Sequence, residues 1–188
     1  MKNFLQNNVT KMIVALAVVG AVSGLSLVFV YKYAMPKIKI NINKEMDKAI
    51  KSIFPGTDKT EKIEGQQDVF KVRDKKGILL GYAFVAEGNG YQGIIKIIVG
   101  VDEKIIKTKG MEVLESQETP GLGAEIANGK FKDQFKGLSI VQAIEYVKNQ
   151  NPQKPYEIEA ITGATISSRA VVNIINKKLA EIREALRK

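Results

Sequence analysis

The sequence has no cysteine and no histidine among its 188 residues. Without cysteine, the chain can form no disulfide bond, no thiolate metal site and no cysteine nucleophile. Without histidine, it lacks the side chain that most often acts as a general base or a metal ligand. We therefore predict no metal site and assign no catalytic residue.

The sequence also lacks the fingerprints of the common nucleotide-binding loops. The glycine-rich stretch 88–93 has no Lys-Ser/Thr pair and does not lead from a strand into a helix. We interpret it as a turn into a strand, with the aromatic residue Tyr91 where the turn meets the strand. The net charge of +9 is compatible with an anionic membrane surface or an acidic partner. The lysines are scattered and aromatic residues do not cluster with them, so we expect no nucleic acid as a partner.

Charge is absent from residues 12–30, which are long enough to cross a bilayer core of about 30 Å. Lys11 and Lys32 flank this run, as expected at a membrane boundary. A cleaved signal peptide usually has a shorter apolar region, and no convincing cleavage site follows. We predict an uncleaved transmembrane helix at about residues 12–31, with membrane lipid as a partner. The predicted anchor is residues 1–37, and the predicted domain is residues 38–188.

The charges around the apolar run give an uncertain orientation. Lysines are more numerous after the run than before it, which by itself would place the larger domain on the cytoplasmic side. These lysines merge into the following domain, however, and Glu45 and Asp47 dilute them. The charge count is therefore a weak guide.

The remainder of the sequence predicts one mixed domain. Apolar residues that alternate indicate strands, and apolar residues at intervals of three and four indicate helices. The order of these elements favours an antiparallel sheet with helices packed on it, the α+β class. The expected strands are 69–72, 78–86, 91–101, 105–114 and 156–161, and the expected helices are 43–54, 131–135, 139–148 and the segment after residue 165.

The stretch 159–168 joins the last predicted strand to the last predicted helix through small and hydroxyl-bearing residues. A helix N-terminus has unpaired backbone N–H groups and a partial positive charge, so such a junction can bind an anion. Gly163 would let a bulky group approach the backbone. The alternative is that Ser167 or Ser168 simply caps the helix, and the spacing alone favours this simpler interpretation.

A second stretch, residues 118–123, combines a proline with two glycines. Proline fixes one backbone dihedral angle and glycine permits tight turns, so the loop is suited to lying against a flat ring. The alternative is an ordinary Pro-Gly turn, which is the commoner use of that pair.

The stretches 88–93, 118–123 and 159–168 together resemble the covalent flavin-binding domain family. The motif of this family, Asp-x-x-Ser/Thr-Gly-Ala-Thr-x-Ser/Thr, is matched in the last of the three stretches. Here Glu159 stands in place of the aspartate. The resemblance implies that a flavin transferase joins the phosphate of FMN to Thr165 through a phosphoester bond. It also implies a set of cofactor-binding residues. These are Glu159, Thr162, Gly163, Ala164, Ser167, Ser168, Glu118, Thr119, Pro120, Gly121, Leu122, Gly123 and Tyr91.

A single membrane helix followed by one such domain is similar to the G subunits of Rnf complexes, which couple electron transfer between ferredoxin and NAD to Na⁺ or H⁺ transport. This resemblance implies an electron-relay subunit of the cytoplasmic membrane, with other membrane subunits as partners and the flavin domain on the non-cytoplasmic side. Such a subunit is not expected to catalyse a reaction alone. Three alternatives remain: a C-type subunit of a Na⁺-translocating NADH:quinone reductase, a stand-alone flavin reductase, and a membrane-anchored binding module without redox activity.

Overall fold

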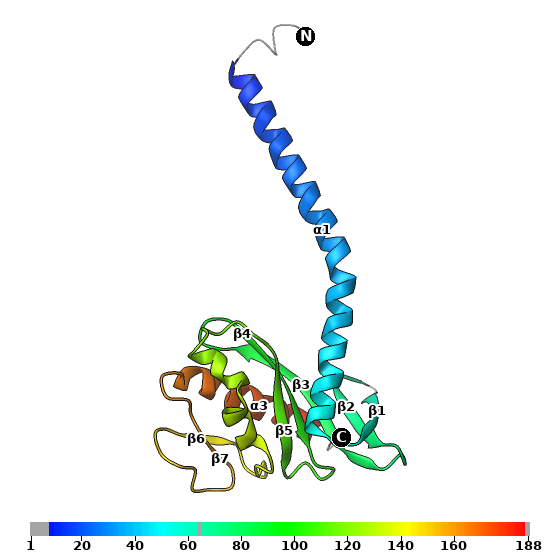
Figure 1. The fold of residues 1–188 in the computed structure, drawn as a ribbon, viewed down its shortest axis with the longest axis vertical. Helices are drawn as coiled ribbons and strands as arrows, with labels where there is room; N and C mark the ends of the chain where they lie inside the picture. The colour runs from blue at the N-terminus through cyan, green and yellow to red at the C-terminus, as the bar shows by residue number, and fades with distance from the viewer. Residues whose placement is uncertain (1–7, 64, 187–188) are drawn as a thin grey trace. The chain divides into compact units, whose positions relative to one another are not determined.

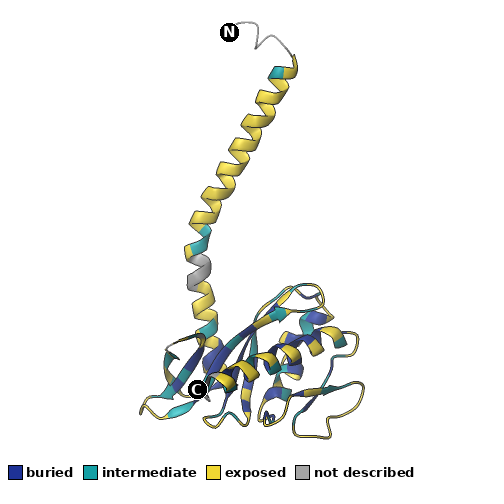
Figure 2. Cartoon of the chain, turned by 180° about the vertical axis from the view of Figure 1, so that it is seen from behind, coloured by how far each residue is buried: buried dark blue, intermediate teal, exposed yellow. Residues whose placement is uncertain are grey.

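The computed structural model describes residues 8–63 and 65–186, and the chain divides into two units, Met1–Lys44 and Glu45–Lys188. The helix α1, Asn8–Ile53, begins in the first unit and passes through Pro36. Its apolar side chains, such as Leu25 and Phe29, are exposed along the stretch predicted to lie in lipid (Figure 2). Among the described residues, α1 alone is long and apolar enough to cross a membrane. The helices expected at 12–31 and 43–54 are thus parts of one continuous helix.

The second unit is built on a five-stranded sheet in which each strand pairs antiparallel with the next one in the sequence (Figure 1). This arrangement confirms the α+β class. The strands β2 to β5 correspond to the four sheet strands expected from the sequence, with shifted ends, whereas the polar strand β1 was not anticipated. The strands are β1 Thr57–Ile63, β2 Gln66–Asp74, β3 Leu79–Asn89, β4 Ile94–Val101 and β5 Thr108–Ser116.

Both faces of the sheet are covered, which explains why β4 is apolar almost throughout. Ile95, Ile97 and Val99 belong to one buried cluster, while Ile98 belongs to the cluster on the opposite face. This division follows from the alternation of side chains along a strand. Each of these fully buried side chains contributes ~1.5–3 kcal/mol through the loss of apolar surface to water.

The last helix, α3, covers one face of the sheet (Figure 1). It spans Thr165–Leu186, and its residues Val171, Ile175 and Leu179 are buried against the sheet, while the opposite side of the helix is exposed (Figure 2). These residues recur at helical spacing, so the helix predicted after residue 165 is confirmed.

The other face of the sheet packs against the end of α1. Ile50, Ile53 and Phe54 are buried there. A Cβ atom at Gly100 would lie 2.3 Å from Cγ2 of Ile53, so the helix can approach β4 this closely only because residue 100 is glycine. The helix ends at Ile53, as the following Pro-Gly pair predicted, and Gly56 adopts a φ of +91°.

The prediction of a helix at 139–148 is wrong. The segment is irregular until β6, Glu145–Val147, which pairs in parallel with β7, Glu157–Glu159. Contacts with α3 explain the difference, because the Asn176 side chain bonds both the N–H and the C=O of Ile144 at 2.8 Å, and Arg183 donates to the carbonyl of Ile140. These tertiary hydrogen bonds satisfy backbone groups that would otherwise be paired within a helix. The segment is therefore irregular although its apolar residues recur at helical spacing.

Short helical segments connect β5 to this region. They are η1 Gly123–Ala127, α2 Gly129–Lys132 and η2 Asp133–Phe135. They include the helical segment expected at 131–135, and Phe131 and Phe135 meet edge to face with ring centroids 5.5 Å apart. The chain that follows the motif stretch 118–123 is therefore anchored in the core.

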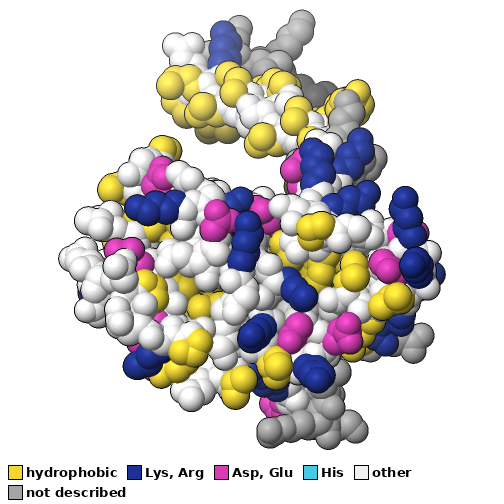
Figure 3. All heavy atoms as spheres, turned by 60° about the horizontal axis from the view of Figure 1, so that its bottom comes forward, with side chains coloured by type: hydrophobic (Ala, Val, Ile, Leu, Met, Phe, Trp, Pro, Cys, Tyr) yellow, Lys and Arg dark blue, Asp and Glu magenta, His cyan; other side chains and the backbone are white. Residues whose placement is uncertain are grey.

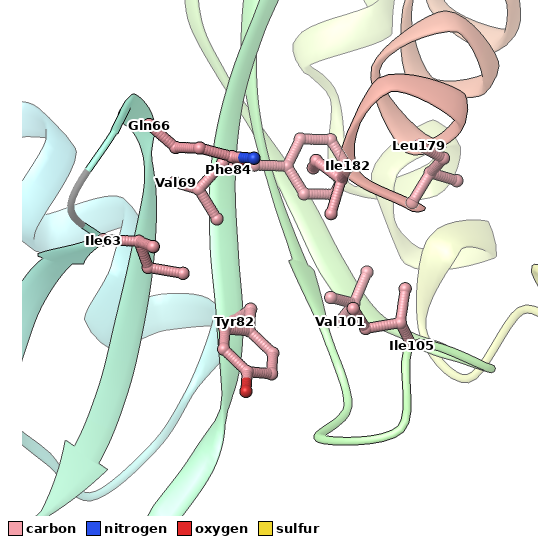
Figure 4. Close-up of a pocket in the computed structure, with 9 residues that line it drawn as sticks. All are labelled: Ile63, Gln66, Val69, Tyr82, Phe84, Val101, Ile105, Leu179 and Ile182. Atoms are coloured by element: carbon pink, nitrogen blue, oxygen red, sulfur yellow. The ribbon is translucent and has the colours of Figure 1, made fainter. Parts of the chain in front are cut away.

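A small apolar hollow lies between the sheet and the C-terminal part of α3 (Figure 4). Tyr82, Leu179 and Ile182 are among the residues that line it. Leu179 is fourteen residues along α3 from Thr165, or roughly 21 Å at 1.5 Å per residue. The hollow is therefore part of the core packing and is separate from the junction at the start of α3.

Candidate functional site

The junction between β7 and α3 is a tight turn. The N–H of Ala164 donates to the carbonyl of Ile161 at 3.0 Å, and Gly163 has a φ of +82°. This left-handed conformation costs glycine little but is strained for other residues. The turn brings the chain directly into α3, which begins at Thr165.

The first turn of α3 presents free backbone donors. Ala164, which precedes the helix, has no side-chain oxygen to cap it, and the N–H of Ser168 is the first to bond back, to the carbonyl of Ala164 at 3.0 Å. The N–H groups of Thr165, Ile166 and Ser167 have no acceptor among the described residues. With the partial positive charge of the helix end, these groups form a site for an anion.

The two serines of the motif do not cap the helix, so the simpler interpretation of these hydroxyls is wrong. The hydroxyl of Ser168 donates to the carbonyl of Ala164 at 3.1 Å and accepts from the N–H of Ile161 at 3.0 Å. The hydroxyl of Ser167 donates to Oε2 of Glu118 at 2.5 Å. Both serines are buried, and both hydroxyls hold the junction in place.

Glu118 is a buried carboxylate, with 6% of its surface exposed. Its Oε1 accepts the backbone N–H groups of Tyr91 at 2.8 Å and Gln92 at 3.0 Å, and its Oε2 accepts the hydroxyl of Ser167. Burial raises the pKa of the Glu118 carboxyl, but the bonds from Ser167 and from the backbone N–H groups of 91–93 outweigh it and hold the pKa below its usual value. The group is thus an anion near neutral pH.

Two glycines make room for this carboxylate. A Cβ atom at Gly90 would lie 2.2 Å from Oε1 of Glu118, and one at Gly123 would lie 2.3 Å from Oε2. Real side chains do not tolerate such distances, so any residue other than glycine would displace the carboxylate. Of the two glycines that suggested a ring-binding loop, Gly123 therefore has a packing role inside the protein, whereas a Cβ atom at Gly121 would meet no atom within 4 Å. The contact of this loop with a flavin stays a prediction.

The loop 118–123 contains the Pro-Gly turn that was the simpler of the two expectations. The N–H of Leu122 donates to the carbonyl of Thr119 at 3.1 Å, and Gly121 has a φ of +75°, as in a type II turn. The hydroxyl of Thr119 donates to Oε1 of Gln92 at 2.5 Å and joins this loop to the stretch 88–93. Pro120 lies at the exposed tip of the turn.

Three apolar side chains remain exposed around the junction. Tyr91 is 69% exposed, Leu122 48% and Ile166 45%. Each belongs to a different motif stretch, and Cδ2 of Leu122 lies 3.5 Å from the position that a Cβ atom would take at Gly163. Exposed apolar groups from two loops and from the first turn of α3 provide a surface on which an aromatic ring can pack.

The beginning of the motif lies beside a groove. Glu159 and Thr162 line this groove together with Lys130 and Gln134. The side-chain amide of Gln134 bonds both the N–H of Glu159, at 2.6 Å, and its carbonyl, at 3.2 Å, and thereby fixes the end of β7. The hydroxyl of Thr162 lies 3.4 Å from Oδ1 of Asn149.

The structure thus brings the three motif stretches together around Glu118, although no single stretch predicted this. Sequence reasoning missed Gly90, Gln92 and Gln134, which place the loops and β7. For Gly90, its position next to Tyr91 in a glycine-rich stretch was an available signal. For Gln134, no sequence signal was present, because its role depends on the position of β7.

Comparison with known proteins gives consistent matches. A model described as the FMN-binding domain matches residues 90–180. The G subunit of an ion-translocating oxidoreductase complex from Methanosarcina acetivorans is 30% identical over 177 residues, covering 89% of this chain and 91% of that protein. The G subunit of a proton-translocating ferredoxin:NAD(+) oxidoreductase complex from Clostridium ljungdahlii is 28% identical over 179 residues, covering 94% and 93%. The crystal structure of Shewanella oneidensis NqrC matches with a TM-score of 0.55 and 28% identity, covering 57% of this chain and 52% of that one.

The fold and the site define an α+β domain that follows an apolar helix and carries an anion site at the start of its last helix. The chain belongs to the FMN-binding domain family that includes the G subunits of ion-translocating oxidoreductase complexes. The resemblance inferred from the three motif stretches is confirmed, as is FMN as the cofactor of the family. The apolar part of α1 and these relatives support association with a membrane.

Proposed function

We propose that Thr165 carries FMN covalently, through a phosphoester bond that a flavin transferase forms between its hydroxyl and the phosphate of the flavin. The observation that carries this proposal is the position of Thr165 at the head of α3, among three N–H groups that have no acceptor in the described residues. A phosphate diester retains one negative charge, which these donors and the helix dipole stabilise.

The other hydroxyls of the motif are less suited to this attachment. Ser167 and Ser168 are buried and engaged in hydrogen bonds, with Glu118 and with the backbone of the turn. Thr162 lies within the turn, with its hydroxyl 3.4 Å from Oδ1 of Asn149, and not on the helix that offers the free N–H groups. Thr165 is partly exposed, and no hydrogen bond of its hydroxyl is found within the described residues.

The residues around Thr165 also suit the remainder of FMN. Tyr91, Leu122 and Ile166 offer exposed apolar surface to the isoalloxazine ring. Bound FMN supplies the capacity to accept and donate electrons, which the chain lacks without histidine and cysteine. The protein contributes the covalent link, which prevents loss of the flavin, and the donors that hold its phosphate.

We infer that the chain is the electron-relay subunit of a membrane-bound, ion-translocating ferredoxin:NAD oxidoreductase complex of the Rnf type. Two relatives cover about nine tenths of this chain, one the G subunit of an ion-translocating oxidoreductase complex and the other the G subunit of a proton-translocating ferredoxin:NAD(+) oxidoreductase complex, whereas NqrC matches 57% of it. The sequence contains no dinucleotide fingerprint and no Cys or His ligands for an iron–sulfur centre. The other membrane subunits of the complex would therefore bind the substrates.

A relay subunit should not turn over NADH by itself. The purified, flavinylated chain in detergent should be reduced by dithionite but should not oxidise NADH catalytically, because nothing in its sequence binds a dinucleotide. Stopped-flow absorbance of the flavin and steady-state consumption of NADH provide the measurement. Turnover at ~1 s⁻¹ or faster, in the range of ordinary enzymes, would favour a stand-alone reductase instead.

The orientation in the membrane follows from the proposed family role and not from the charge count. We infer that residues 1–37 form the anchor and that residues 38–188 lie on the non-cytoplasmic side. On the face shown in Figure 3, charged side chains of both signs are interspersed over the second unit, so this face gives no strong orientation signal of its own.

An introduced cysteine tests this orientation without interference, because the natural sequence has none. Lys75 lies in the exposed turn between β2 and β3, where Asp74 Oδ1 accepts the N–H of Lys76 at 2.8 Å. The Lys75→Cys variant should react with a membrane-impermeant thiol reagent in intact cells. A Lys2→Cys control, before the apolar helix, should react only after lysis. The reverse pattern would place the flavin domain in the cytoplasm.

A further inference from the structure

Glu118 joins all three motif stretches through one side chain. Oε1 accepts two backbone N–H groups from the loop at Tyr91 and Gln92, and Oε2 accepts the hydroxyl of Ser167 on the first turn of α3. Glu118 itself begins the loop that ends at Gly123, where the missing side chain leaves space for Oε2. Its partners lie 27, 26 and 49 residues away in the sequence, so these bonds fix parts of the chain that have no local connection.

The surroundings of Glu118 suit a carboxylate, because hydrogen-bond donors face both of its oxygens. The side chain is almost fully buried, and every bond described for its two oxygens is donated to it. A neutral carboxylic acid would have to donate its own proton, and none of these partners is placed as an acceptor apart from the hydroxyl of Ser167. Burying an anion is costly unless such donors compensate for the lost water.

We propose that Glu118 is a positioning residue of the flavin site: its carboxylate holds the first turn of α3, which carries Thr165 and the free N–H groups, against the loops that present Tyr91 and Leu122. This proposal rests on the attachment of FMN at Thr165. Glu118 acts through Ser167 and through the backbone at Tyr91 and Gln92, and so it sets the distance between the phosphate donors and the apolar surface offered to the ring.

Hydrogen exchange of the full-length protein in detergent tests this role directly. Glu118→Ala leaves the N–H groups of Tyr91 and Gln92 and the hydroxyl of Ser167 without their partner. The amides of segment 88–93 and the two hydrogen-bonded amides at the start of α3, those of Ala164 and Ser168, should then exchange about tenfold faster or more, as expected when a buried hydrogen bond is lost. Glu115→Ala, at an exposed position three residues earlier, is the matched control and should leave both segments unchanged.

A second pair of variants separates positioning from a general loss of stability. Glu118→Gln keeps an acceptor for Tyr91 and Gln92 and offers an amide donor to Ser167, so it should restore exchange to within about threefold of the original protein. Ser167→Ala removes only the bond to Oε2. It should therefore accelerate exchange at Ala164 and Ser168 and leave 88–93 protected, and it remains informative if Glu118→Ala does not fold.

The flavin provides a readout that a purely structural residue would not change. In the flavinylated protein, the steady-state fluorescence anisotropy of FMN should fall in Glu118→Ala, because the ring loses its fixed surroundings, and should be retained in Glu118→Gln and Glu115→Ala. Unchanged exchange and anisotropy in Glu118→Ala would overturn the proposal, as would a Glu118→Gln variant that behaves like Glu118→Ala. If the original protein carries no flavin at Thr165, the proposed function fails, while exchange in the flavin-free protein still decides whether Glu118 fixes the junction.

Discussion

Thr165→Ala should abolish covalent flavin while leaving the fold intact. The substitution removes the hydroxyl that we propose forms the phosphoester, and the partly exposed Thr165 side chain has no hydrogen bond within the described residues. Loss of its few atoms should cost no more than about 1 kcal/mol of unfolding free energy. The intact mass of protein co-expressed with a flavin transferase should therefore decrease by one FMN adduct.

Thr162→Ala is the matched control for this experiment. Thr162 lies in the same motif but in the turn that precedes α3, where its hydroxyl contacts Asn149. This variant should keep the adduct, and peptide mapping should place the flavin on Thr165. A flavin found on Thr162 or Ser167, or an original protein that acquires no adduct, would contradict the assignment.

The same Thr165→Ala variant should interrupt electron flow in the assembled complex. Without its flavin, the protein has no group that can relay electrons, so ferredoxin:NAD oxidoreduction should fall to the background rate. NADH oxidation by artificial acceptors should persist, because we expect another subunit to bind NADH. Loss of both activities would indicate instead that Thr165 is needed for assembly, which blue-native electrophoresis of the complex would reveal.

Gly123→Ala should strongly destabilise the site. Its new methyl group would lie 2.3 Å from Oε2 of Glu118 and 2.6 Å from Oγ of Ser167. Relief of this overlap requires the carboxylate or the serine to move, which breaks their hydrogen bond. We expect a loss of about 2–3 kcal/mol in unfolding free energy, from overpacking and from the broken bond.

Urea unfolding followed by circular dichroism measures this effect, with Gly129→Ala as the control. Gly129 lies close by in the chain, at the start of α2, but the nearest atom to an added Cβ atom would be Oδ2 of Asp133 at 3.8 Å, an ordinary contact. Gly129→Ala should therefore be neutral or slightly stabilising, since alanine has the higher helix propensity. Equal changes in unfolding free energy in the two variants would mean that Glu118 and Ser167 can move aside at little cost.

The sequence predicted those parts of the fold whose packing repeats at a fixed interval. The buried residues of α3 recur at helical spacing, and the apolar run at 91–101 predicted the strand β4, which the structure places between two buried clusters. The same reasoning failed at 139–148, where Ile140 and Ile144 are buried but their backbone groups bond Arg183 and Asn176 of α3. It missed β1 because this strand is polar and mostly exposed or half-buried.

The candidate site shows a similar division. The strand–turn–helix junction could be predicted because all of its parts lie within ten residues of sequence. The role of Glu118 could not, because its bond to Ser167 spans 49 residues and depends on the way in which β5 and α3 meet. A loop of prolines and glycines indicates a tight turn, but it does not show which side chain fills the space beside the glycines.

The burial of the end of α1 determines where the proposed membrane anchor can be cut away to obtain a soluble protein. Ile50, Ile53 and Phe54 fill one face of the sheet, each contributing ~1.5–3 kcal/mol by burial, and Phe70 and Ile98 would be uncovered without them. A truncated chain that starts after Gly56 would expose this apolar face and aggregate, even though it retains every strand and the whole flavin motif. A soluble fragment suited to electrochemistry or crystallisation should start no later than Glu45, so that the last turns of the helix remain as a cover for the sheet.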